Sequence, residues 1–437
     1  MTPSARLAAA VDVLRDIETQ ARSARDALKA WGSGARYAGA KDRAWVSGLV
    51  LDVLRRRRSL EWAIGIEGPR AAALSALVNA WGWPAEQAAE AAAGAPHGPG
   101  ALTDEEARGL AAPRSLADAP PPIAGDYPDW LDAGMERAFG AVRAVEGAAL
   151  ARRAPVDLRA NVLKTDADHV AEVLEPAGAE RSAIVANAFR IAAPVAADRA
   201  PAVEGLPAFA DGWFEVQDLG SQIAAAAAGP IAGRQVLDLC AGGGGKTLAL
   251  SAAMANTGQI YAYDTDARRL AEASGRAQRA GVRNLQVIQP TSLGLLGELE
   301  GRMDLVFVDA LCTGSGTWRR RPDAKWRLTP AQLAQRIGDQ DAVLATAAGL
   351  VRTGGRVVYV TCSVLAEENE DRIAAFLAGS PGFAVIPSLE AIAASGLATE
   401  AGATHLADHA TPEGFLRLSP RSGGTDGFFI AVLERRS

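Results

Sequence analysis

The stretch VLDLCAGGGGKT, residues 236–247, decides the fold of this chain. A short apolar run ends at Asp238, and four consecutive glycines follow it shortly afterwards. Glycines let a backbone turn tightly and approach a ligand without a Cβ in the way. The residues after them continue as a helix, whose first N–H groups point at the ligand in folds of this kind. We therefore predict a strand, a ligand-binding turn and a helix, the first unit of an α/β sheet.

The same alternation of strand and helix continues from this stretch to the end of the sequence. Short, β-branched apolar runs are separated by helix-forming stretches such as 266–280 and 330–350. Alternation of this kind predicts a parallel, doubly wound sheet over residues 226–437, with ligands bound at the carboxyl ends of its strands. The further strand-like runs are QIYAYD (259–264), LQVIQ (285–289), DLVFVD (304–309), RVVYVT (356–361) and GFFIAVL (427–433).

Two other patterns precede this region. Residues 1–145 are predicted to be all-helical, because apolar residues recur three or four positions apart, as at Leu7 and Val11. The proline-rich stretch APPPIAGDYPDW interrupts this pattern and marks a boundary or a rigid linker. Residues 146–225 then mix strand-like runs with a short helix and predict a small α+β module. The expected domains are 1–145, 146–225 and 226–437.

Composition restricts the class of protein. The sequence has no charge-free run of ~20 apolar residues, so we expect no membrane-spanning helix. The first residues include acidic ones and no apolar signal core, and only three cysteines occur in 437 residues, which fits a reducing compartment. The cysteines and the four histidines show no metal-ligand spacing. We expect a cytoplasmic, monomeric protein without a membrane partner or a bound metal.

Three classes of ligand compete for the glycine-rich turn. A nucleoside triphosphate would need G-x-x-x-x-G-K-[ST]; Lys246 and Thr247 fit its end, but Cys240 stands at its first glycine. A dinucleotide would need G-x-G-x-x-G, and Thr247 stands at its last glycine. S-adenosylmethionine carries no phosphate, and its ribose needs an acidic residue at the end of the second strand, where Asp264 stands. Asp264 could instead cap the next helix, although Asp266 could take that role.

Two of the three cysteines follow neighbouring strand-like runs. Cys312 comes three residues after Asp309, and Cys362 directly follows VVYVT, so both thiols reach one cleft if these runs pair. A thiolate that adds to carbon 6 of a pyrimidine makes carbon 5 nucleophilic towards a methyl sulfonium, and a second group must then assist release. Cys362, Cys312 and Asp309 can supply the nucleophile, the release group and the acid. The alternative is that cysteines only pack as small buried side chains, which we favour for Cys240.

A basic and aromatic segment follows Cys312. The net charge of −6 argues weakly against a nucleic-acid partner, since phosphate attracts Lys and Arg. Local distribution matters more than the total, and in TWRRRPDAKWR cations interleave with Trp318 and Trp326. A solvated surface is the alternative interpretation. The residues predicted to contact RNA phosphates are Arg319, Arg320, Arg321 and Lys325.

These motifs, taken together and in this order, resemble the NOL/NOP/Sun family of RNA 5-methylcytosine methyltransferases. The resemblance covers roughly residues 155–435 and also includes RANVLKT (159–165), FEVQDLGSQ (214–222) and TDGFFIA (425–431). It implies a class I methyltransferase Rossmann-like domain whose seven-stranded sheet has its last strand antiparallel. It also implies an S-adenosylmethionine-dependent RNA (cytosine-5)-methyltransferase.

The resemblance implies roles for individual residues as well. Cys362 would be the nucleophile that adds to carbon 6 of the target cytosine, Cys312 the thiol that assists release, and Asp309 a contact to the base and the cofactor. Thr291 stands about where the family has an acid near the adenine, and its hydroxyl can still make one hydrogen bond. The residues expected to bind S-adenosylmethionine are Cys240, Ala241, Gly242, Gly243, Gly244, Gly245, Lys246, Asp264, Thr291 and Asp309.

The N-terminal stretch AKDRAWVSGLVLDVLRRRRSLEWAIG, residues 40–65, resembles the NusB-like RNA-binding domain of the family's 16S ribosomal RNA branch. This resemblance favours small-subunit ribosomal RNA over transfer RNA as the partner. The chain departs from the family at Gly243 and Leu311, where the family has proline. The alternatives that stay open are a transfer-RNA methyltransferase, a catalytically impaired RNA-binding or ribosome-assembly protein, and a P-loop-like NTPase.

Overall fold

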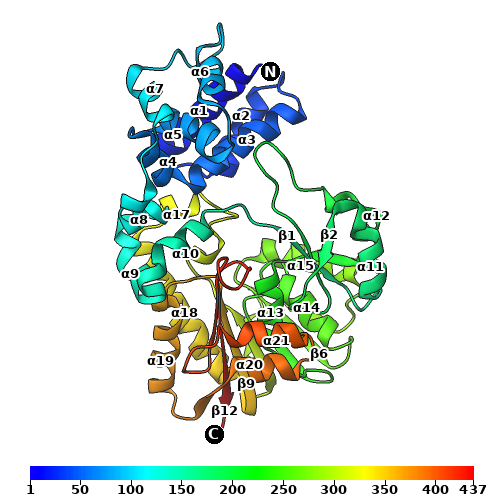
Figure 1. Cartoon of the computed structure of the whole chain (residues 1–437). Helices are drawn as coiled ribbons and strands as arrows, with labels where there is room; N and C mark the ends of the chain where they lie inside the picture. Colours follow the sequence, from blue (N-terminus) through cyan, green and yellow to red (C-terminus); the bar gives the residue numbers. More distant parts are fainter. The chain divides into compact units, whose positions relative to one another are not determined.

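The computed structural model describes the backbone of residues 1–437 and the side chains of all of them except Leu293. The chain forms two compact units, which Figure 1 draws with sequence colours. We call them the helical unit and the α/β unit. The helical unit comprises Met1–Ala154, Ala193–Ala200 and Thr317–Leu328, and the α/β unit comprises Pro155–Ala192, Pro201–Gly316 and Thr329–Ser437. Two segments remote from the N-terminus therefore belong to the helical unit.

Apolar residues at helical spacing build the core of the helical unit. Leu7, Leu49 and Leu74, from three different helices, are fully buried in one cluster. Thr2 caps the first helix, because its side-chain oxygen accepts a backbone N–H of the first turn. The described backbone of residues 1–150 contains helices and turns and no strand, as the periodicity predicts. The α-helices are α1 (Pro3–Gln20), α2 (Ala24–Gly34), α3 (Ala40–Arg55), α4 (Arg57–Ile64), α5 (Pro69–Ser75), α6 (Ala85–Ala93), α7 (Asp104–Ala111), α8 (Pro121–Ala124), α9 (Asp132–Phe139), α10 (Arg143–Leu150) and α17 (Ala324–Arg327).

The segment Thr317–Leu328, which contains α17, completes this core. Trp318 is buried, and the indole N–H of Trp326 donates to the carbonyl of Leu54 at 2.6 Å. The ammonium of Lys325 is also buried and donates to the carbonyl of Arg55 at 2.5 Å. A segment that lies between two elements of the α/β unit in the sequence is thus held by the end of α3.

The α/β unit contains a small antiparallel sheet with the strand order β2-β3-β1-β4. Its core includes Leu158, Phe189 and Phe214, together with Val170 from α11. β1 and β3 lie within residues 146–225, where the sequence predicts strand-like runs. The elements are β1 (Val156–Ala160), α11 (Ala167–Leu174), β2 (Ala179–Arg181), β3 (Ala188–Ile191), α12 (Pro207–Ala210) and β4 (Phe214–Val216).

The main sheet has eight strands in the order β10-β12-β9-β8-β5-β6-β7, with β11 paired to β12. The five strands from β9 to β7 are parallel, and β12 runs antiparallel to β9. The strands are β5 (Gln235–Asp238), β6 (Gln259–Tyr263), β7 (Leu285–Ile288), β8 (Met303–Asp309), β9 (Val351–Thr361), β10 (Phe383–Ile386), β11 (Leu416–Leu418) and β12 (Phe428–Arg435).

The expectation of a seven-stranded sheet is therefore wrong by one strand, whereas the antiparallel last strand is confirmed. The extra strand is β11, which pairs Leu416 with Ile430 and Leu418 with Phe428. Leu416 and Leu418 are fully buried. Burial of these two leucines against β12 is the physical reason for the additional pairing.

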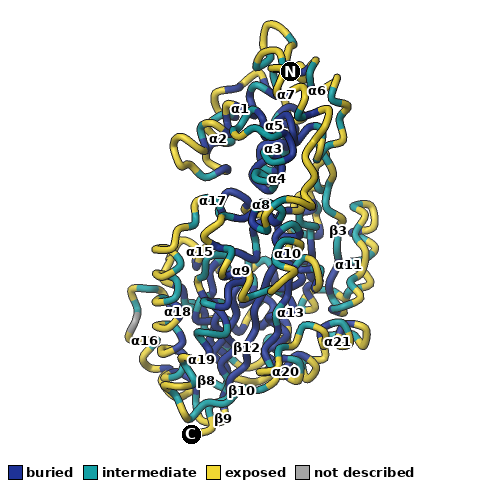
Figure 2. Tube along the Cα trace, turned by 60° about the vertical axis from the view of Figure 1, so that its left-hand side comes forward, coloured by how far each residue is buried: buried dark blue, intermediate teal, exposed yellow. Residues whose placement is uncertain are grey.

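Alternate residues of the strands face two different layers of helices. Leu305 and Phe307 pack in one apolar cluster with Ile223 of α13, whereas Val306 and Val308 pack in another with Leu344 of α18. This period of two is the strand pattern, and two covered faces are what a doubly wound sheet requires. Figure 2 shows the strands as the buried centre of this unit. The helices are α13 (Leu219–Ala226), α14 (Gly245–Ala253), α15 (Ala267–Ala280), α16 (Leu293–Gly297), α18 (Pro330–Leu350), α19 (Glu370–Gly379), α20 (Ser388–Ala394) and α21 (Glu400–Ala407).

The parallel pairing brings the ends of four strands to one edge of the sheet. β5 ends at Asp238, β6 at Tyr263, β8 at Asp309 and β9 at Thr361. The residues predicted to be functional in the α/β unit follow these ends directly or within a few positions. Within the described part of the chain, none of the helices is long and apolar enough to cross a bilayer.

Candidate active site

The glycine-rich loop joins β5 to α14. Gly242 and Gly244 have φ values of 52° and 82°, which residues with a side chain rarely adopt. Gly244 is also the N-cap of α14. The backbone N–H of Gly242 donates to Oδ2 of Asp264 at 2.8 Å. A Cβ at Gly242 would lie 2.3 Å from Nη2 of Arg269. The loop therefore needs glycine at these two positions, and its turn is tied to the end of β6.

The two aspartates after β6 divide the roles that the sequence left open. Asp266 is the N-cap of α15, because its side chain accepts the N–H of Arg268. Asp264 is buried, and each of its carboxylate oxygens accepts one backbone N–H, from Gly242 and from Asp266. A carboxylate has about four lone-pair sites, so both oxygens can accept further hydrogen bonds. These acceptors fit the two hydroxyl groups of a ribose, which would donate to them.

Two side chains complete this part of the edge. Thr291, three residues after the end of β7, is exposed. Cys240 packs against the apolar cluster that contains Leu237 and Val306. Burial, and then the charge of Asp238, raise the pKa of the Cys240 thiol. This thiol is therefore a poor nucleophile and has the surroundings of a packing residue.

Lys246 and Asp309 form an ion pair across the edge. The ammonium of Lys246 donates to Oδ2 of Asp309 at 2.7 Å and lies 5.4 Å from the ring centre of Phe428. Burial lowers the pKa of Lys246, but the charge and the hydrogen bond of Asp309, together with the charges of Cys362 and Asp238, outweigh it and leave the pKa raised. Lys246 thus carries a proton beside a carboxylate. A P-loop lysine faces phosphate instead, so this pairing counts against the NTPase alternative.

The two predicted thiols lie side by side. Cys312 follows β8 and Cys362 follows β9, and their Sγ atoms are 3.4 Å apart. The hydrogen bond with Cys362 and burial raise the pKa of Cys312, in that order of importance. Cys312 therefore holds its proton strongly at the point where the two sulfurs meet. Such a pair can provide one attacking sulfur and one proton-bearing neighbour.

The two thiol loops are joined to each other behind the sulfurs. The hydroxyls of Ser315 and Ser363 lie 2.9 Å apart, and the N–H of Gly316 donates to the carbonyl of Cys362. The N–H of Gly427, just before β12, donates to the carbonyl of Gly316, and a Cβ at Gly316 would lie 2.2 Å from the carbonyl oxygen of Gly427. This contact between backbones requires glycine and fixes the Cys312 loop against the last strand.

Sequence reasoning did not identify two residues that support this arrangement, Glu368 and Gly427. Glu368 lies in the AEENE run that follows Cys362, so its proximity to the thiol motif was a usable signal. Gly427 lies in TDGFFIA, which contributed only to the family resemblance.

The predicted RNA-binding residues all belong to the segment Thr317–Leu328 of the helical unit. Arg320 and Arg321 are exposed. Arg319 and Lys325 are buried, and Lys325 donates to a backbone carbonyl. Burial lowers the pKa of Lys325 to about 7. A phosphate contact therefore remains a proposal for Arg320 and Arg321, whereas the burial of Arg319 and Lys325 leaves them in the protein interior.

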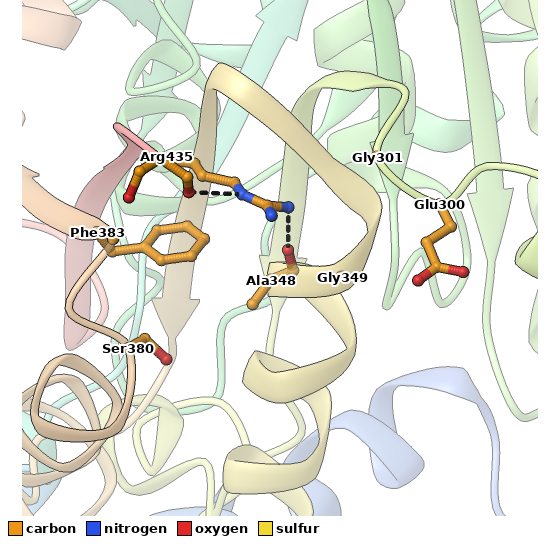
Figure 3. Close-up of a pocket in the computed structure, with 9 residues that line it drawn as sticks. Glu300, Gly301, Ala348, Gly349, Ser380, Phe383 and Arg435 are labelled. Atoms are coloured by element: carbon orange, nitrogen blue, oxygen red, sulfur yellow. Dashed lines mark hydrogen bonds between the residues drawn. The ribbon is translucent and has the colours of Figure 1, made fainter.

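A hollow of about 510 Å³ lies elsewhere in the α/β unit (Figure 3). Its lining includes Gly301 and Gly349, which precede β8 and β9, so it lies at the opposite ends of these strands. The guanidinium of Arg435 donates hydrogen bonds to the backbone oxygens of Ala348 and Ser437 there. Among the described side chains, no three His, Cys, Asp or Glu residues are grouped so that they could hold a metal ion.

Comparison with known proteins identifies similar chains. Residues 226–434 match a family described as "16S rRNA methyltransferase RsmB/F". The "Probable ribosomal RNA small subunit methyltransferase B" of Synechocystis sp. is 32% identical over 314 residues, which are 71% of this chain and 67% of the relative. The corresponding enzyme of Klebsiella pneumoniae is 35% identical over 260 residues, which are 58% of each chain. The matched stretches thus cover between 58% and 67% of these relatives' own lengths.

Solved structures share the fold. The crystal structure of PH0851 matches with a TM-score of 0.70 and 24% identity, over 99% of both chains. A methyltransferase homologue from Pyrococcus horikoshii matches 74% of this chain and 100% of its own, with a TM-score of 0.58 and 25% identity. NSun6 from the same organism, solved with SFG, matches 71% of this chain and 98% of its own, with a TM-score of 0.60 and 20% identity.

Proposed function

This chain belongs to the RsmB/F family of 16S rRNA methyltransferases, and from that premise we propose that it transfers a methyl group from S-adenosylmethionine to carbon 5 of a cytosine in small-subunit ribosomal RNA. The observation that carries the proposal is the pair of thiols, with sulfurs 3.4 Å apart, at the sheet edge that also holds the Lys246–Asp309 ion pair. Methyl transfer to carbon 5 needs a nucleophile, a release group and an acid together, and these four side chains can supply them.

The residues around the glycine-rich loop fit the cofactor. Asp264 can accept hydrogen bonds from the ribose hydroxyls, and the loop from Cys240 to Lys246 lets the ligand approach its backbone. Thr291 would lie near the adenine and Asp309 near the methyl group. When bound, S-adenosylmethionine supplies an electrophilic methyl group.

The thiol of Cys362, as thiolate, would add to carbon 6 of the cytosine. Carbon 5 then gains the electron density needed to take the methyl group, and the proton on carbon 5 leaves to a base as the sulfur–carbon bond breaks. Cys312 would assist this release, because its S–H can hydrogen-bond to the departing sulfur 3.4 Å away. Lys246 holds a proton 2.7 Å from Asp309, so the pair can serve as the acid that stabilises negative charge on the ring of the adduct.

The target base must leave its stack to reach the sulfurs, so the RNA would be single-stranded or locally opened at the target. Arg320 and Arg321 are exposed and would contact phosphates. We further propose that the helical unit is the NusB-like RNA-binding domain, which its resemblance supports. The departure at Leu311, whose exposed fraction is 51%, motivates the alternative of a catalytically impaired RNA-binding protein.

The test is transfer of labelled methyl groups from S-adenosylmethionine to 16S ribosomal RNA and to transfer RNA, both lacking the modification. The proposal expects 5-methylcytosine on the ribosomal RNA with wild type only, and none with Cys362→Ala. Label found only on transfer RNA would show that transfer RNA, and not ribosomal RNA, is the substrate. Absence of label with bound cofactor and bound RNA would favour the impaired RNA-binding protein.

A further inference from the structure

Glu368 is a fully buried carboxylate with three donors around it. It lies at the end of a short 3-10 helix, Ala366–Glu368, between Cys362 and α19. Its Oε1 accepts the backbone N–H of Thr313 at 2.8 Å, and its Oε2 accepts the hydroxyl of Thr313 at 2.5 Å. Both oxygens are therefore bound by the residue that directly follows Cys312.

Gln340 of α18 extends this contact to the other side of Cys312. Its Nε2 donates to Oε1 of Glu368 at 3.0 Å and to the carbonyl of Leu311 at 3.1 Å. The peptide groups before and after Cys312 are thus both held from the same point. The backbone carbonyl of Glu368 also accepts the hydroxyl of Tyr359 from β9 at 2.7 Å, which fixes the carboxylate relative to the strand that ends before Cys362.

Among the described side chains, no Lys or Arg forms an ion pair with Glu368. A buried charge held by neutral donors alone is costly unless its hydrogen bonds are well made. If the loop needed only rigidity, a neutral acceptor would provide it with less desolvation. The negative charge therefore calls for an explanation in terms of its neighbour Cys312.

We propose that Glu368 is a positioning residue for Cys312, which holds this thiol against Cys362 and, through its charge, keeps Cys312 as the proton-bearing partner in product release while Cys362 attacks. This inference rests on the proposed function. It is supported by the pKa of Cys312, which is raised by the hydrogen bond with Cys362, by burial, and also by the charges of Cys362 and Glu368. Glu368 touches neither sulfur, so it acts through the Thr313 backbone and through its field.

Release of the methylated base from Cys362 and attack of Cys362 on the base are different steps, and they can be measured separately. A fault in Cys312 alone leaves Cys362 bonded to carbon 6 of the RNA, whereas general damage to the site lowers adduct formation and methyl transfer together. The fraction of protein that remains covalently bound to RNA after denaturation therefore distinguishes a positioning role from a merely structural one.

The experiment compares four forms of the full chain with unmethylated 16S ribosomal RNA and S-adenosylmethionine: wild type, Cys312→Ala, Glu368→Gln and Glu370→Gln. Gln at position 368 keeps the volume but points an NH₂ group at one of the three donors. Losing one hydrogen bond to a charged group changes a rate or an equilibrium constant about tenfold. We expect about tenfold more adduct and about tenfold slower turnover in Glu368→Gln, with cofactor binding unchanged.

The matched control is Glu370→Gln, the same chemical change two residues further on. Glu370 pairs with Arg417 and has no described bond to the Cys312 loop, so it should behave as wild type. Thr313→Val removes only the hydroxyl donor to Glu368 and decides the question if Glu368→Gln does not fold. It should also raise the adduct about tenfold, since here too a single hydrogen bond to the charged carboxylate is lost, and Thr313→Ser should restore the wild-type level.

Cys312→Ala distinguishes the two failures. Adduct in Cys312→Ala, together with none above the wild-type level in Glu368→Gln and Thr313→Val, would overturn the role of Glu368 and leave the proposed function intact. No adduct in Cys312→Ala would overturn the covalent mechanism itself. An adduct in Glu368→Gln that persists when Cys362 is also replaced by Ala would assign the bond to another residue and overturn both.

Discussion

The two halves of the active-site edge differ in how many hydrogen-bond donors they provide to a buried carboxylate. In the half formed by β5 and β6, Asp238 is fully buried, but its only described donor is the hydroxyl of Thr247, and Oδ1 has no described partner. In the half formed by β8 and β9, Glu368 is equally buried and receives three donors. Burial, opposed by the Thr247 bond and assisted by the charges of Asp309 and Asp264, raises the pKa of Asp238 to about 7.

The difference teaches how the two halves are built. In the thiol half, side chains from β9, α18 and the AEENE run bond the backbone on both sides of Cys312 and so hold the two sulfurs in place in advance. The cofactor half relies on glycine backbone and on carboxylates that keep lone pairs for further donors. The reacting groups are thus held in fixed positions after β8 and β9, whereas the groups that can adapt to a ligand follow β5 and β6.

The largest expected effect is in the thiol half. Cys362→Ala removes the proposed nucleophile, so methyl transfer to 16S ribosomal RNA should fall by on the order of 10⁴-fold or more. The affinity for S-adenosylmethionine, measured by calorimetry, should stay at the wild-type value, because Cys362 is not among the residues expected to bind the cofactor. A parallel loss of cofactor binding would break the comparison between the two halves.

The second prediction concerns the poorly satisfied carboxylate. The pKa of Asp238 in the folded state is about 7, above its ordinary value of 3.8, so the folded protein binds this proton more tightly than the unfolded chain. The stability that it contributes is complete below about pH 4 and is lost as the pH rises through 7. Asp238→Asn should therefore gain a few kcal/mol over wild type between pH 4 and pH 8.

Urea unfolding at several pH values checks this. The neutral Asn can still accept the hydroxyl of Thr247, so the comparison isolates the charge. Equal pH slopes for the two proteins would show that Asp238 does not titrate with a raised pKa.

The third prediction compares one glycine in each half. Gly316→Ala places a Cβ 2.2 Å from the carbonyl of Gly427 and should lower the free energy of unfolding by about 1–3 kcal/mol. Gly243→Ala has its nearest neighbours at 3.7 Å and no positive φ, so its unfolding free energy should stay within about 0.5 kcal/mol of wild type. Chemical denaturation measures both. A larger loss for Gly243→Ala would reverse the contrast.

The fourth prediction tests the cofactor half directly. Asp264→Ala removes the acceptor for the ribose hydroxyls and a bond to the glycine loop, so the Kd for S-adenosylmethionine should rise about 10- to 100-fold. At saturating cofactor the rate of methyl transfer should change little, since the sulfurs are held by other strands. A fall in this rate without a change in Kd would contradict the assignment of Asp264.

The smallest expected effect belongs to the helical unit. Arg320→Ala or Arg321→Ala should weaken RNA binding several-fold and lower the slope of log affinity against log salt by about one for each lost phosphate contact. The maximal rate with saturating RNA should be unaffected. A salt slope identical to wild type for both variants would remove these residues from the RNA interface.

The sequence alone predicted the elements whose signal is local. The strand ends and the convergence of Cys312 and Cys362 follow from period-two patterns and from parallel pairing, whereas the sequence left open which of Asp264 and Asp266 caps the helix. The role of Glu368 could not be predicted in this way, because its partner Gln340 lies 28 residues away on a helix whose register was unknown.

In the basic segment 317–327, tertiary contacts that the sequence does not reveal also decided which residues are exposed. Arg319 and Lys325 were predicted to contact RNA phosphates because they lie among other cations and tryptophans. Whether they are buried depends on the end of α3, since Lys325 and its acceptor, the carbonyl of Arg55, are 270 residues apart. Charge patterns report which side chains can meet phosphate, and only tertiary packing decides which of them do.

That packing also has a consequence for the order in which the protein is made. Trp318 and Lys325 are buried in the helical unit, and Trp326 packs on its core, yet all three are synthesised after most of the α/β unit. As the chain emerges from a ribosome, the helices of residues 1–154 can form and pack early, but their contact with Trp326 waits until this residue has appeared. The first part of the chain to be translated therefore completes its contacts late, and a fragment that stops before Trp326 leaves exposed the apolar surface that this residue covers.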